Sequence, residues 1–352
     1  MAYIDGSCAL KLDWKPVFEL QIFALNTNKT TDTTATTGND LSPEMKTYYK
    51  NKLIKMAEPE LVFDQFANKY DVPKNSGLTT EFRRITPLSH SVSDAVLSEG
   101  VTPNGQKLDT SAMTVTLGQY GRFVTRSDLL DLTAIDPILA ESTEAIASQA
   151  GHVLNLVTRN VLIAGSNVMY APKANGTAIS TRATVAADCT MTLNMIRKAR
   201  LQLRRYDAPR FDGYYVAIVH PDVAMDIREL SGWTDINKYG APERIYNGEI
   251  GMIEGVRFIE NTECKVFEDA GASDVNVYAT MFVGKGGYGV TNLEGAGLEL
   301  IVKQQGSAGT EDALNQRSTV GWKAVKAAAI MIPQYVVRVE SCSSMEATAI
   351  VN

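Results

Sequence analysis

The chain has 352 residues, enough for one large domain or two to three ordinary ones. Hydrophobic residues make up 45% and charged residues 21%, which is ordinary globular usage, so a packed core can form and wholesale disorder is excluded. The formal net charge is -6 and no Arg-rich N-terminal arm is present. This balance argues against a protein that condenses nucleic acid with its own positive charge.

Cysteine usage and hydrophobic runs give no sign of secretion or of a membrane span. Four cysteines are spread along the chain without a C-x-x-C pair: Cys8, Cys189, Cys264 and Cys342. Their spacing favours free thiols in a reducing cytosol over a disulfide framework. The apolar run near the N-terminus is interrupted by Glu19 and Gln21 and lacks a small-residue cleavage site, so we reject a signal peptide. No run approaches the roughly 20 apolar residues of a membrane span.

The N-terminal region predicts a strand, a linker and a helix. Alternating apolar residues favour a strand within residues 10–25, and the Thr-rich stretch 27–38 is typical of an extended linker. Ser42 suits the N-cap and Pro43 the first position of a following helix. We expect this helix to end near Pro59 and to carry the apolar side chains Tyr48, Tyr49, Leu53 and Met56.

Residues 73–126 predict a long hairpin. Thr79 to Ile85 is one strand candidate, and Met113 to Val124 is the return strand because apolar residues and threonines alternate there. The turn signal Pro103-Asn104-Gly105 lies between them. The tip carries little apolar content in this interpretation. Because an isolated two-stranded hairpin is marginal in water, such an arm needs something to lie against, and a neighbouring subunit is the natural candidate.

Asp136-Pro137 begins the strongest predicted helix, with a carboxylate at the N-cap and proline at the first helical position. The helix ends at Gly165, and its apolar stripe consists of Leu139, Ile146, Ala150, Val153, Val157 and Val161. Some 28 residues would give a rod of about 42 Å.

A mixed module follows the long helix. We expect a second helix after Thr192, a buried strand over Tyr214 to Val219, and a short helix from His220-Pro221 to Leu230. Further strand candidates are 256–259, 275–283, 298–302 and 320–332, and Val337 and Val339 alternate with Arg338 and Glu340. Together these elements indicate an α+β fold.

The search for catalytic motifs gives no residue that predicts chemistry. Gly284 to Gly289 contains G-x-G-x-x-G after a strand, but no helical pattern follows to hold a phosphate, so a strand connection is favoured. Three histidines occur, His90, His152 and His220, and none has ligand spacing. His220 lies at a strand end where a base could act, but no nucleophile motif accompanies it. We therefore expect no catalytic, cofactor or metal site.

Basic residues cluster after Thr192, where Arg197, Arg200 and Arg204 share one helix face. They could contact phosphates, but a solvated or subunit-bridging face is favoured. The same interpretation applies to Glu81-Phe82-Arg83-Arg84 in the hairpin. The candidates for contact between subunits are Phe82, Arg83, Arg84, Pro103, Asn104, Gly105, Arg197, Arg200 and Arg204.

A series of short segments carries a resemblance to a known family. In chain order they are LVFDQF (61–66), PKNSG (73–77), EFRR (81–84), LSEGVTP (97–103), QYG (119–121), DLTAIDP (131–137), VAIVHPD (216–222), YNGEIG (246–251), GSAGT (306–310) and LNQRSTVGWK (314–323). From residue 41 to residue 342 the chain resembles the major capsid proteins typified by the short-tailed coliphage N-four.

This resemblance implies the Hong Kong 97 capsid fold. It implies an N-terminal arm (1–72, of which 1–40 precede the family pattern), an extended loop (73–126), a peripheral domain (127–185) with a spine helix (137–164), an axial domain (186–317) and return strands with the C-terminus (318–352). It also implies a structural subunit, not an enzyme, that assembles as hexamers and pentamers into an icosahedral shell around double-stranded DNA. The expected location is the virion capsid, assembled in the host bacterial cytoplasm. Portal and decoration proteins are expected partners, and a membrane is not.

Two alternatives stay open at this point. An encapsulin-like nanocompartment shell shares the fold class, and shell size and contents would separate it from a phage head. The second alternative is a nucleotide-dependent enzyme. This interpretation depends on the G-x-G-x-x-G match and on His220, and a helix directly after Gly289 would favour it.

No long helical scaffolding segment precedes the family pattern, so we expect that no large N-terminal domain is removed during maturation. Mass spectrometry of subunits from mature shells checks this expectation. A subunit mass close to that of the full chain would agree with it, and a mass short by tens of residues would contradict it.

Overall fold

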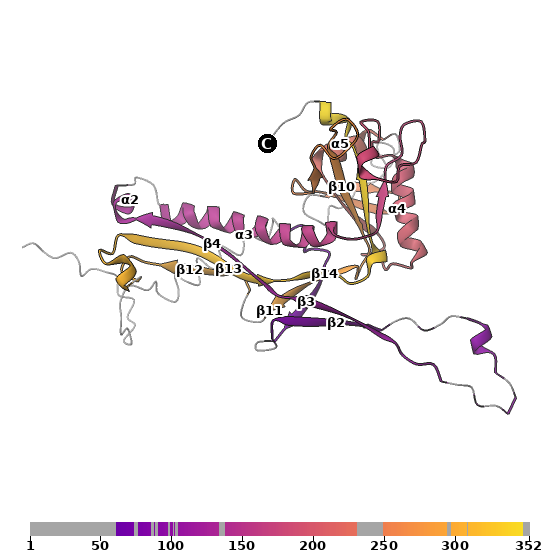
Figure 1. Ribbon diagram of the computed structural model, residues 1–352, viewed down its shortest axis with the longest axis horizontal. Helices are drawn as coiled ribbons and strands as arrows, with labels where there is room; N and C mark the ends of the chain where they lie inside the picture. Colours follow the sequence, from indigo (N-terminus) through magenta and orange to yellow (C-terminus); the bar gives the residue numbers. More distant parts are fainter. Residues whose placement is uncertain are drawn as a thin grey trace, which may run out of the picture.

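The computed structural model describes residues 61–73, 77–85, 88, 91–97, 99–100, 102, 105–133, 138–230, 249–293, 297–307 and 309–347. The molecule is elongated: a long helix lies along a narrow sheet, a compact unit sits at one end, and a two-stranded arm projects away (Figure 1). The strand, linker and helix expected before residue 60, and the helix start at Asp136-Pro137, lie outside the described residues.

A seven-stranded sheet forms the centre of the compact unit. Its path is β5 (Val168–Tyr170), β15 (Val336–Ser341), β10 (Val277–Val283), β6 (Tyr215–Val219), β8 (Val256–Glu260) and β7 (Glu249–Ile253), with β9 (Val266–Phe267) paired to β10. β6 is parallel to β8 and antiparallel to β10. All five residues of β6 are buried, which confirms the strand expected from this continuous apolar run.

The two faces of this sheet are covered by different parts of the chain. Tyr215, Ala217 and Val219 of β6 face α4 (Leu193–Arg205) and α5 (Pro221–Glu229). Val216 and Ile218 face the end of the long helix and the segment 62–66. Both short helices begin as expected, because the Thr192 hydroxyl accepts from the Met195 amide and Pro221 occupies the first turn of α5.

The long helix α3 (Ile138–Ile163) has 26 residues and packs on a three-stranded sheet. That sheet has the order β12 (Glu299–Lys303), β13 (Arg317–Lys326) and β4 (Gly118–Ser127), with both pairs antiparallel. The buried side chains of this contact are Ile146, Ala147, Ala150, Leu154, Val320, Trp322 and Ala324. The expected stripe is correct at Ile146 and Ala150, whereas Val157 and Val161 are only half-buried and Leu162 is buried instead.

The arm consists of β2 (Thr79–Ile85) and β3 (Thr110–Thr116), paired from Thr79↔Thr116 to Ile85↔Thr110. The expected single return strand is wrong, because it divides at Leu117. Residues before Leu117 pair with β2, and residues from Gly118 onward form β4 and pair with β13. Leu117 itself is buried at this change of partner. In the exposed arm its apolar side chain would face water.

The boundary expected at residue 317, between the axial domain and the return strands, does not coincide with a division between the sheets. β15 pairs with β10 and β5 inside the compact unit, although it lies in the segment expected to return to the peripheral domain. β11 (Tyr288–Leu293) leaves that unit and pairs with β1 (Asn68–Val72) and β14 (Ala328–Ile330). Apolar and polar residues alternate along β15, but all of its residues are buried. Arg182 and Arg338 both pair with the fully buried Glu340, so the polar face of the strand is covered as well.

A polar junction joins the segment 61–66, α3 and β13. The Lys326 ammonium lies 2.5 Å from an Asp64 carboxylate oxygen and donates to the Leu154 carbonyl at 2.8 Å. The Thr158 hydroxyl donates to the other Asp64 oxygen at 2.6 Å. Burial lowers the pKa of Lys326, and the Asp64 carboxylate raises it in opposition. The junction therefore holds an ionic contact inside the protein, where each partner needs the other.

The close contact of β13 and β4 at Gly321 is open to test. An alanine Cβ there would lie 2.8 Å from the Phe123 Cβ and 2.9 Å from the Arg122 carbonyl oxygen. We expect Gly321→Ala to lower the free energy of unfolding by about 1–3 kcal/mol because the two strands must separate to admit it. Gly297→Ala is the matched control, since its Cβ would meet nothing within 4 Å. Urea denaturation measures both, and equal effects would contradict the close packing.

Candidate intersubunit surfaces

The glycine-rich segment does not form a nucleotide site. Gly284 to Gly289 runs directly into β11, whose first residue Tyr288 is buried and donates its hydroxyl hydrogen to the Phe63 carbonyl. A strand therefore follows the glycines in place of the helix that a dinucleotide fingerprint needs. The prediction of a strand connection is confirmed.

The two described histidines, His152 and His220, each contact neighbouring polar groups of the fold. His90 lies outside the described residues. His152 of α3 contacts a Glu263 carboxylate oxygen through Nδ1 at 2.5 Å. His220 caps α5: its Nδ1 accepts from the Asp222 amide at 3.3 Å, and its ring lies 5.0 Å from that of Tyr278. Burial lowers the pKa of His220, although Asp222 and Glu260 oppose the shift.

Thiols and carboxylates in the described part of the chain do not form a metal site. No group of three or more His, Cys, Asp or Glu side chains is placed to hold an ion there. Cys189, Cys264 and Cys342 are buried and form no disulfide among the described residues, and burial raises the pKa of the Cys189 and Cys264 thiols. In the same described residues, no helix is both long and apolar enough to cross a membrane.

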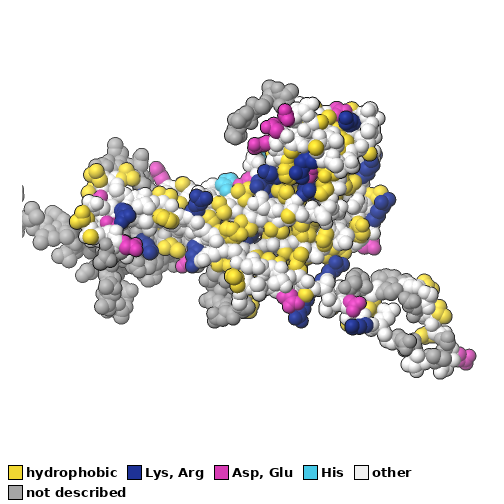
Figure 2. Space-filling view, in the orientation of Figure 1, with side chains coloured by type: hydrophobic (Ala, Val, Ile, Leu, Met, Phe, Trp, Pro, Cys, Tyr) yellow, Lys and Arg dark blue, Asp and Glu magenta, His cyan; other side chains and the backbone are white. Residues whose placement is uncertain are grey.

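The arm exposes apolar side chains along its length, contrary to the expectation of a tip with little apolar content. The exposed ones are Leu78, Ile85, Leu88, Val92, Val96, Leu97, Leu108 and Met113. Val92 is 80% exposed and flanks the short turn Ser93–Ala95 in the outer part of the arm. Figure 2 shows hydrophobic side chains on the surface of this outer part and also at the opposite end of the molecule. A row of exposed apolar groups on a thin arm indicates a contact surface.

The hairpin candidates from the sequence divide into different environments. Phe82 is buried, with its ring 4.8 Å from that of Tyr70, so it anchors the arm to its own chain. Arg83 is exposed and pairs with Glu81 at 3.3 Å, while Arg84 is half-buried. Gly105 is exposed, and Pro103 and Asn104 lie outside the described residues.

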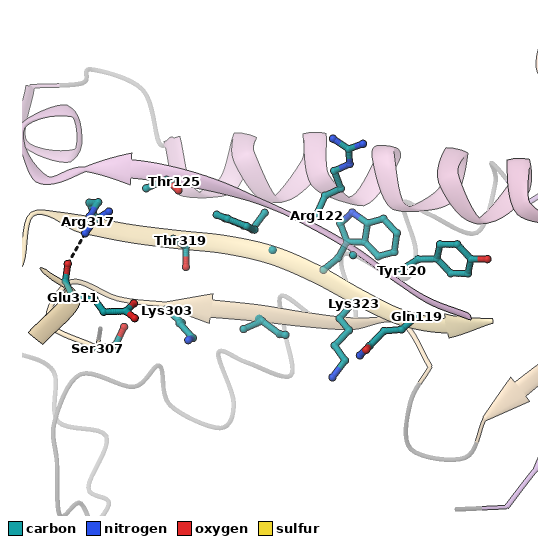
Figure 3. Close-up of a pocket in the computed structure, with 15 residues that line it drawn as sticks. Gln119, Tyr120, Arg122, Thr125, Lys303, Ser307, Glu311, Arg317, Thr319 and Lys323 are labelled. Atoms are coloured by element: carbon teal, nitrogen blue, oxygen red, sulfur yellow. Dashed lines mark hydrogen bonds between the residues drawn. The ribbon is translucent and has the colours of Figure 1, made fainter. Parts of the chain in front are cut away.

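A second surface is the face of the three-stranded sheet that turns away from α3. Figure 3 shows Thr319, Lys303 and Lys323 on this side, and Tyr120 and Arg122 toward α3. Across the strands, Phe123 pairs with Gly321 and Gly321 with Ile301. Because Gly321 has no side chain, the middle of the face is hollow between Phe123, which is 71% exposed, and Ile301, which is 37% exposed.

Charged groups border this hollow face. Lys303 and Lys323 stand beside it, and Arg317 donates to the Glu311 carbonyl at 2.7 Å (Figure 3). The outer arm carries exposed Glu99 and Asp109. Exposed Lys107 lies in the same part of the arm, and Glu311 lines the hollow face. Both surfaces therefore combine exposed apolar side chains with charges of either sign, which suits contact between copies of the chain. Sequence reasoning missed this face because the exposed side of β4 and β13 is visible only when their register is known.

The basic row of α4 is partly neutralised inside the chain. Arg197 donates to one Glu254 oxygen at 2.8 and 3.0 Å, and Arg200 donates to the other at 3.1 Å. Glu254 has φ +53° and precedes Gly255 in the turn between β7 and β8. Arg204 is exposed on the same helix. The sequence separation of more than 50 residues hid Glu254, although the Glu-Gly pair between two strand candidates is a turn signal.

Comparisons with known proteins give one family match and several solved structures of similar fold. A family model described as phage capsid protein matches residues 67–296, which is more than half of the chain. The Cyanophage Pam1 capsid is 15% identical with TM-score 0.63, and the match covers 92% of this chain and 99% of that one. The Ralstonia phage GP4 capsid is 14% identical with TM-score 0.62, covering 82% and 92%. The Helicobacter pylori bacteriophage KHP40 head is 13% identical with TM-score 0.55, covering 79% and 88%. No curated protein matches the sequence.

The surroundings of His220 predict a pH dependence of stability. Because burial lowers its pKa in the folded state, the unfolded state takes up a proton near the ordinary value of 6.5 while the folded state stays neutral. The free energy of unfolding should therefore fall as pH drops through 6.5 toward the lower folded value.

His220→Asn keeps a capping side chain and removes the titration. We expect a smaller loss of stability below pH 6.5 in this variant than in the unaltered protein. Urea denaturation at several pH values measures the difference, and parallel curves for the two proteins would exclude a contribution from His220.

Proposed function

This chain belongs to the phage capsid protein family, and we propose that its subunits build a shell by laying the arm of one copy over the open sheet face of the next. Membership makes the chain a structural capsid subunit and not an enzyme, with an α+β capsid fold shared with phage heads. The single observation that carries the proposed contact is the pair of exposed apolar surfaces, the arm and the hollow face around Gly321, on one molecule.

Both surfaces leave large apolar side chains exposed in the isolated chain. A two-stranded ribbon gains little from its own burial. In β2 and β3 only Phe82 is buried, and Thr80, Arg84 and Val115 are half-buried. The sheet β12-β13-β4 buries one face against α3 and leaves Phe123 and Ile301 exposed on the other. Apposition of the two surfaces would remove apolar area from water at about 25 cal/mol per Å².

The two surfaces differ from each other, so the contact is head-to-tail. A heterologous contact of this kind closes into a ring when the rotation between subunits allows it. Rings of five and six subunits are the pentamers and hexamers that an icosahedral shell requires. The mechanism is geometric: many modest contacts add over a closed lattice, and no single contact must be strong.

Several finer assignments belong to this proposal. The arm, within residues 73–126, is the extended loop, α3 is the spine helix within the peripheral domain, and residues 1–72 are an N-terminal arm. The compact unit is the axial domain. Of the expected range 186–317 it contains the elements up to β10, together with β5 and β15, whereas β11 and β12 belong to the other sheets. The resemblance in sequence supports the N-four-like group with a Hong Kong 97 fold.

The biological setting is proposed in the same way. The shell encloses double-stranded DNA of a tailed phage without sequence-specific binding, consistent with the formal net charge of -6. Assembly takes place in the host bacterial cytoplasm, with portal and decoration proteins as partners of the finished virion.

The proposed contact is tested by placing a charge on the hollow face. Phe123→Asp should reduce the yield of shells by more than about tenfold, because an unpaired carboxylate is buried in every contact. The free energy of unfolding of the isolated subunit should change by less than about 0.5 kcal/mol, since Phe123 is exposed there. Sedimentation and electron microscopy measure assembly, and urea denaturation measures stability.

Cross-linking provides the control for position. A double variant Val92→Cys with Ile301→Cys, treated with a short bismaleimide, should give a ladder of covalent oligomers from assembled shells. Each single variant is the matched control and should give no ladder. Normal assembly of Phe123→Asp together with no ladder from the double variant would contradict the arm-on-face contact.

A further inference from the structure

The outer face of α4 presents one apolar side chain inside a ring of positive charge. The inner side of the helix is buried against the seven-stranded sheet, and Leu201 is 49% exposed on the other side. Residues three and four positions away are neighbours on a helix surface. For Leu201 these neighbours are all exposed and all cationic, and they form the cationic ring: Arg197, Lys198, Arg204 and Arg205. α4 contains no acidic residue, and the turn after it carries charges of both signs, with Asp207, Asp212 and Arg210 exposed.

Glu254 neutralises only part of this charge. It pairs with Arg197 and Arg200, whereas the other cations of the ring make no ion pair within the described part of the chain: Lys198, Arg204 and Arg205. An apolar side chain surrounded by charged ones has the anatomy of a protein interface, with an apolar centre and a polar rim. Phosphates of a nucleic acid would pair with the rim but would leave the Leu201 side chain without an apolar contact. The face therefore suits an acidic protein surface.

A loop surface at the start of β10 carries the opposite charge. Its exposed carboxylates come from the connection between β9 and β10 and from the loop before α4, and they form the acidic loop surface: Asp188, Glu268, Asp269 and Asp274. The two loops lie together because the Ala272 amide donates to the Val185 carbonyl at 2.7 Å. Half-buried Ile179 and Val275 give this surface an apolar part. The described cations of the same region are half-buried: Lys173, Arg182 and Lys265.

Hydrogen bonds hold the loop between β9 and β10 in one shape. The Gly271 amide donates to the Val275 carbonyl at 2.8 Å, and the Asp269 amide donates to the side-chain oxygen of Asn276 at 3.0 Å. A loop that is already ordered loses less conformational freedom when it binds a partner.

The two charged surfaces lie on different sides of the compact unit. The acidic loop surface adjoins Val277, the first residue of β10, at one end of the seven-stranded sheet. The cationic ring faces away from this sheet, on the outer side of α4 (Figure 1). One copy of the chain can therefore offer its acidic surface to one neighbour and its cationic ring to another, which is a head-to-tail contact. Because a shell surrounds each subunit with identical copies, a second copy is the occupant that carries the matching surface.

We propose that the acidic loop surface of one copy binds the cationic ring around Leu201 on the next copy in the shell. The proposal rests on the proposed shell function, and it adds a contact between compact units to the contact between arm and sheet face. Complementary charge raises the rate of encounter and selects the orientation of the neighbour more than it raises affinity. Salt screens exposed charges over about 10 Å at 0.1 M ionic strength, so this contact weakens as salt is added.

A photo-cross-linker at position 201 of the full-length chain tests which surface covers the cationic ring. In assembled shells, Leu201→benzoylphenylalanine should attach to the tryptic peptide 266–285, which contains Glu268, Asp269 and Asp274. The product should have the mass of two chains. The matched control is Met225→benzoylphenylalanine, because Met225 is 42% exposed on α5, and it should not label that peptide.

Attachment of the probe at position 201 to another peptide, to nucleic acid or within one chain would overturn the contact. Shells without any labelled product would overturn it too and would leave the shell function standing. Absence of shells from the unaltered protein would overturn both, so the two failures are distinguishable.

Charge reversal provides a second measurement that needs no probe. Lys198→Glu and Glu268→Lys should each slow shell assembly by about tenfold at low salt, because each places like charges against one another. Together they should slow it by less than the product of the two single effects, since the reversed charges attract again. The matched control combines Lys198→Glu with Glu229→Lys, an exposed position on α5 that gives the same net charge, and its effects should multiply. Light scattering measures the assembly rate, and effects that multiply in both pairs would contradict the contact.

Discussion

The extended half of this molecule depends on one contact, the packing of α3 on a single face of the sheet β12-β13-β4. The central strand β13 directs Val320, Trp322 and Ala324 toward α3 and directs Thr319, Gly321 and Lys323 away. This alternation provides one dry face and one wet face. Without α3, the inward side chains of this sheet would lose their main packing partner. With α3 in place, the sheet is stable but its second face remains available.

The polar junction fixes how the segment 61–66, α3 and β13 meet. Apolar packing alone is tolerant of rotation, because side chains of similar volume can exchange places. The Asp64–Lys326 pair with Thr158 is less tolerant, since an ionic contact inside the protein is costly unless its partners keep their geometry. Nearby, Asn155 accepts from the Phe63 amide, so the same turn of α3 holds the entering chain at two points.

The sequence was sufficient for features that depend on local pattern. Helix-capping residues and apolar residues at helical spacing located α3, α4 and α5 to within a few residues. The run from Tyr214 to Val219 was correctly predicted as a buried strand. The capsid fold came from the resemblance of ordered segments, which family and structural comparison support. What the sequence could not show were pairings between distant residues. Exposed Phe123 and buried Leu117 occur in one alternating run, and only the partners of β3 and β4 separate them. Glu254 was missed for the same reason, because its role depends on arginines in α4.

The arginines of this subunit are largely paired within the chain, whereas large apolar side chains of the arm and of the hollow face are exposed. Of the arginines singled out from the sequence, Arg83 pairs with Glu81, and Arg197 and Arg200 pair with Glu254, all within one chain. The large apolar side chains of the arm and of the hollow face are exposed on the same molecule. Exposed ion pairs contribute at most about 1 kcal/mol each and are screened by salt. The proposed contact between subunits therefore depends chiefly on apolar burial and shape. In the proposed shell, each subunit would be held by the sum of many such contacts.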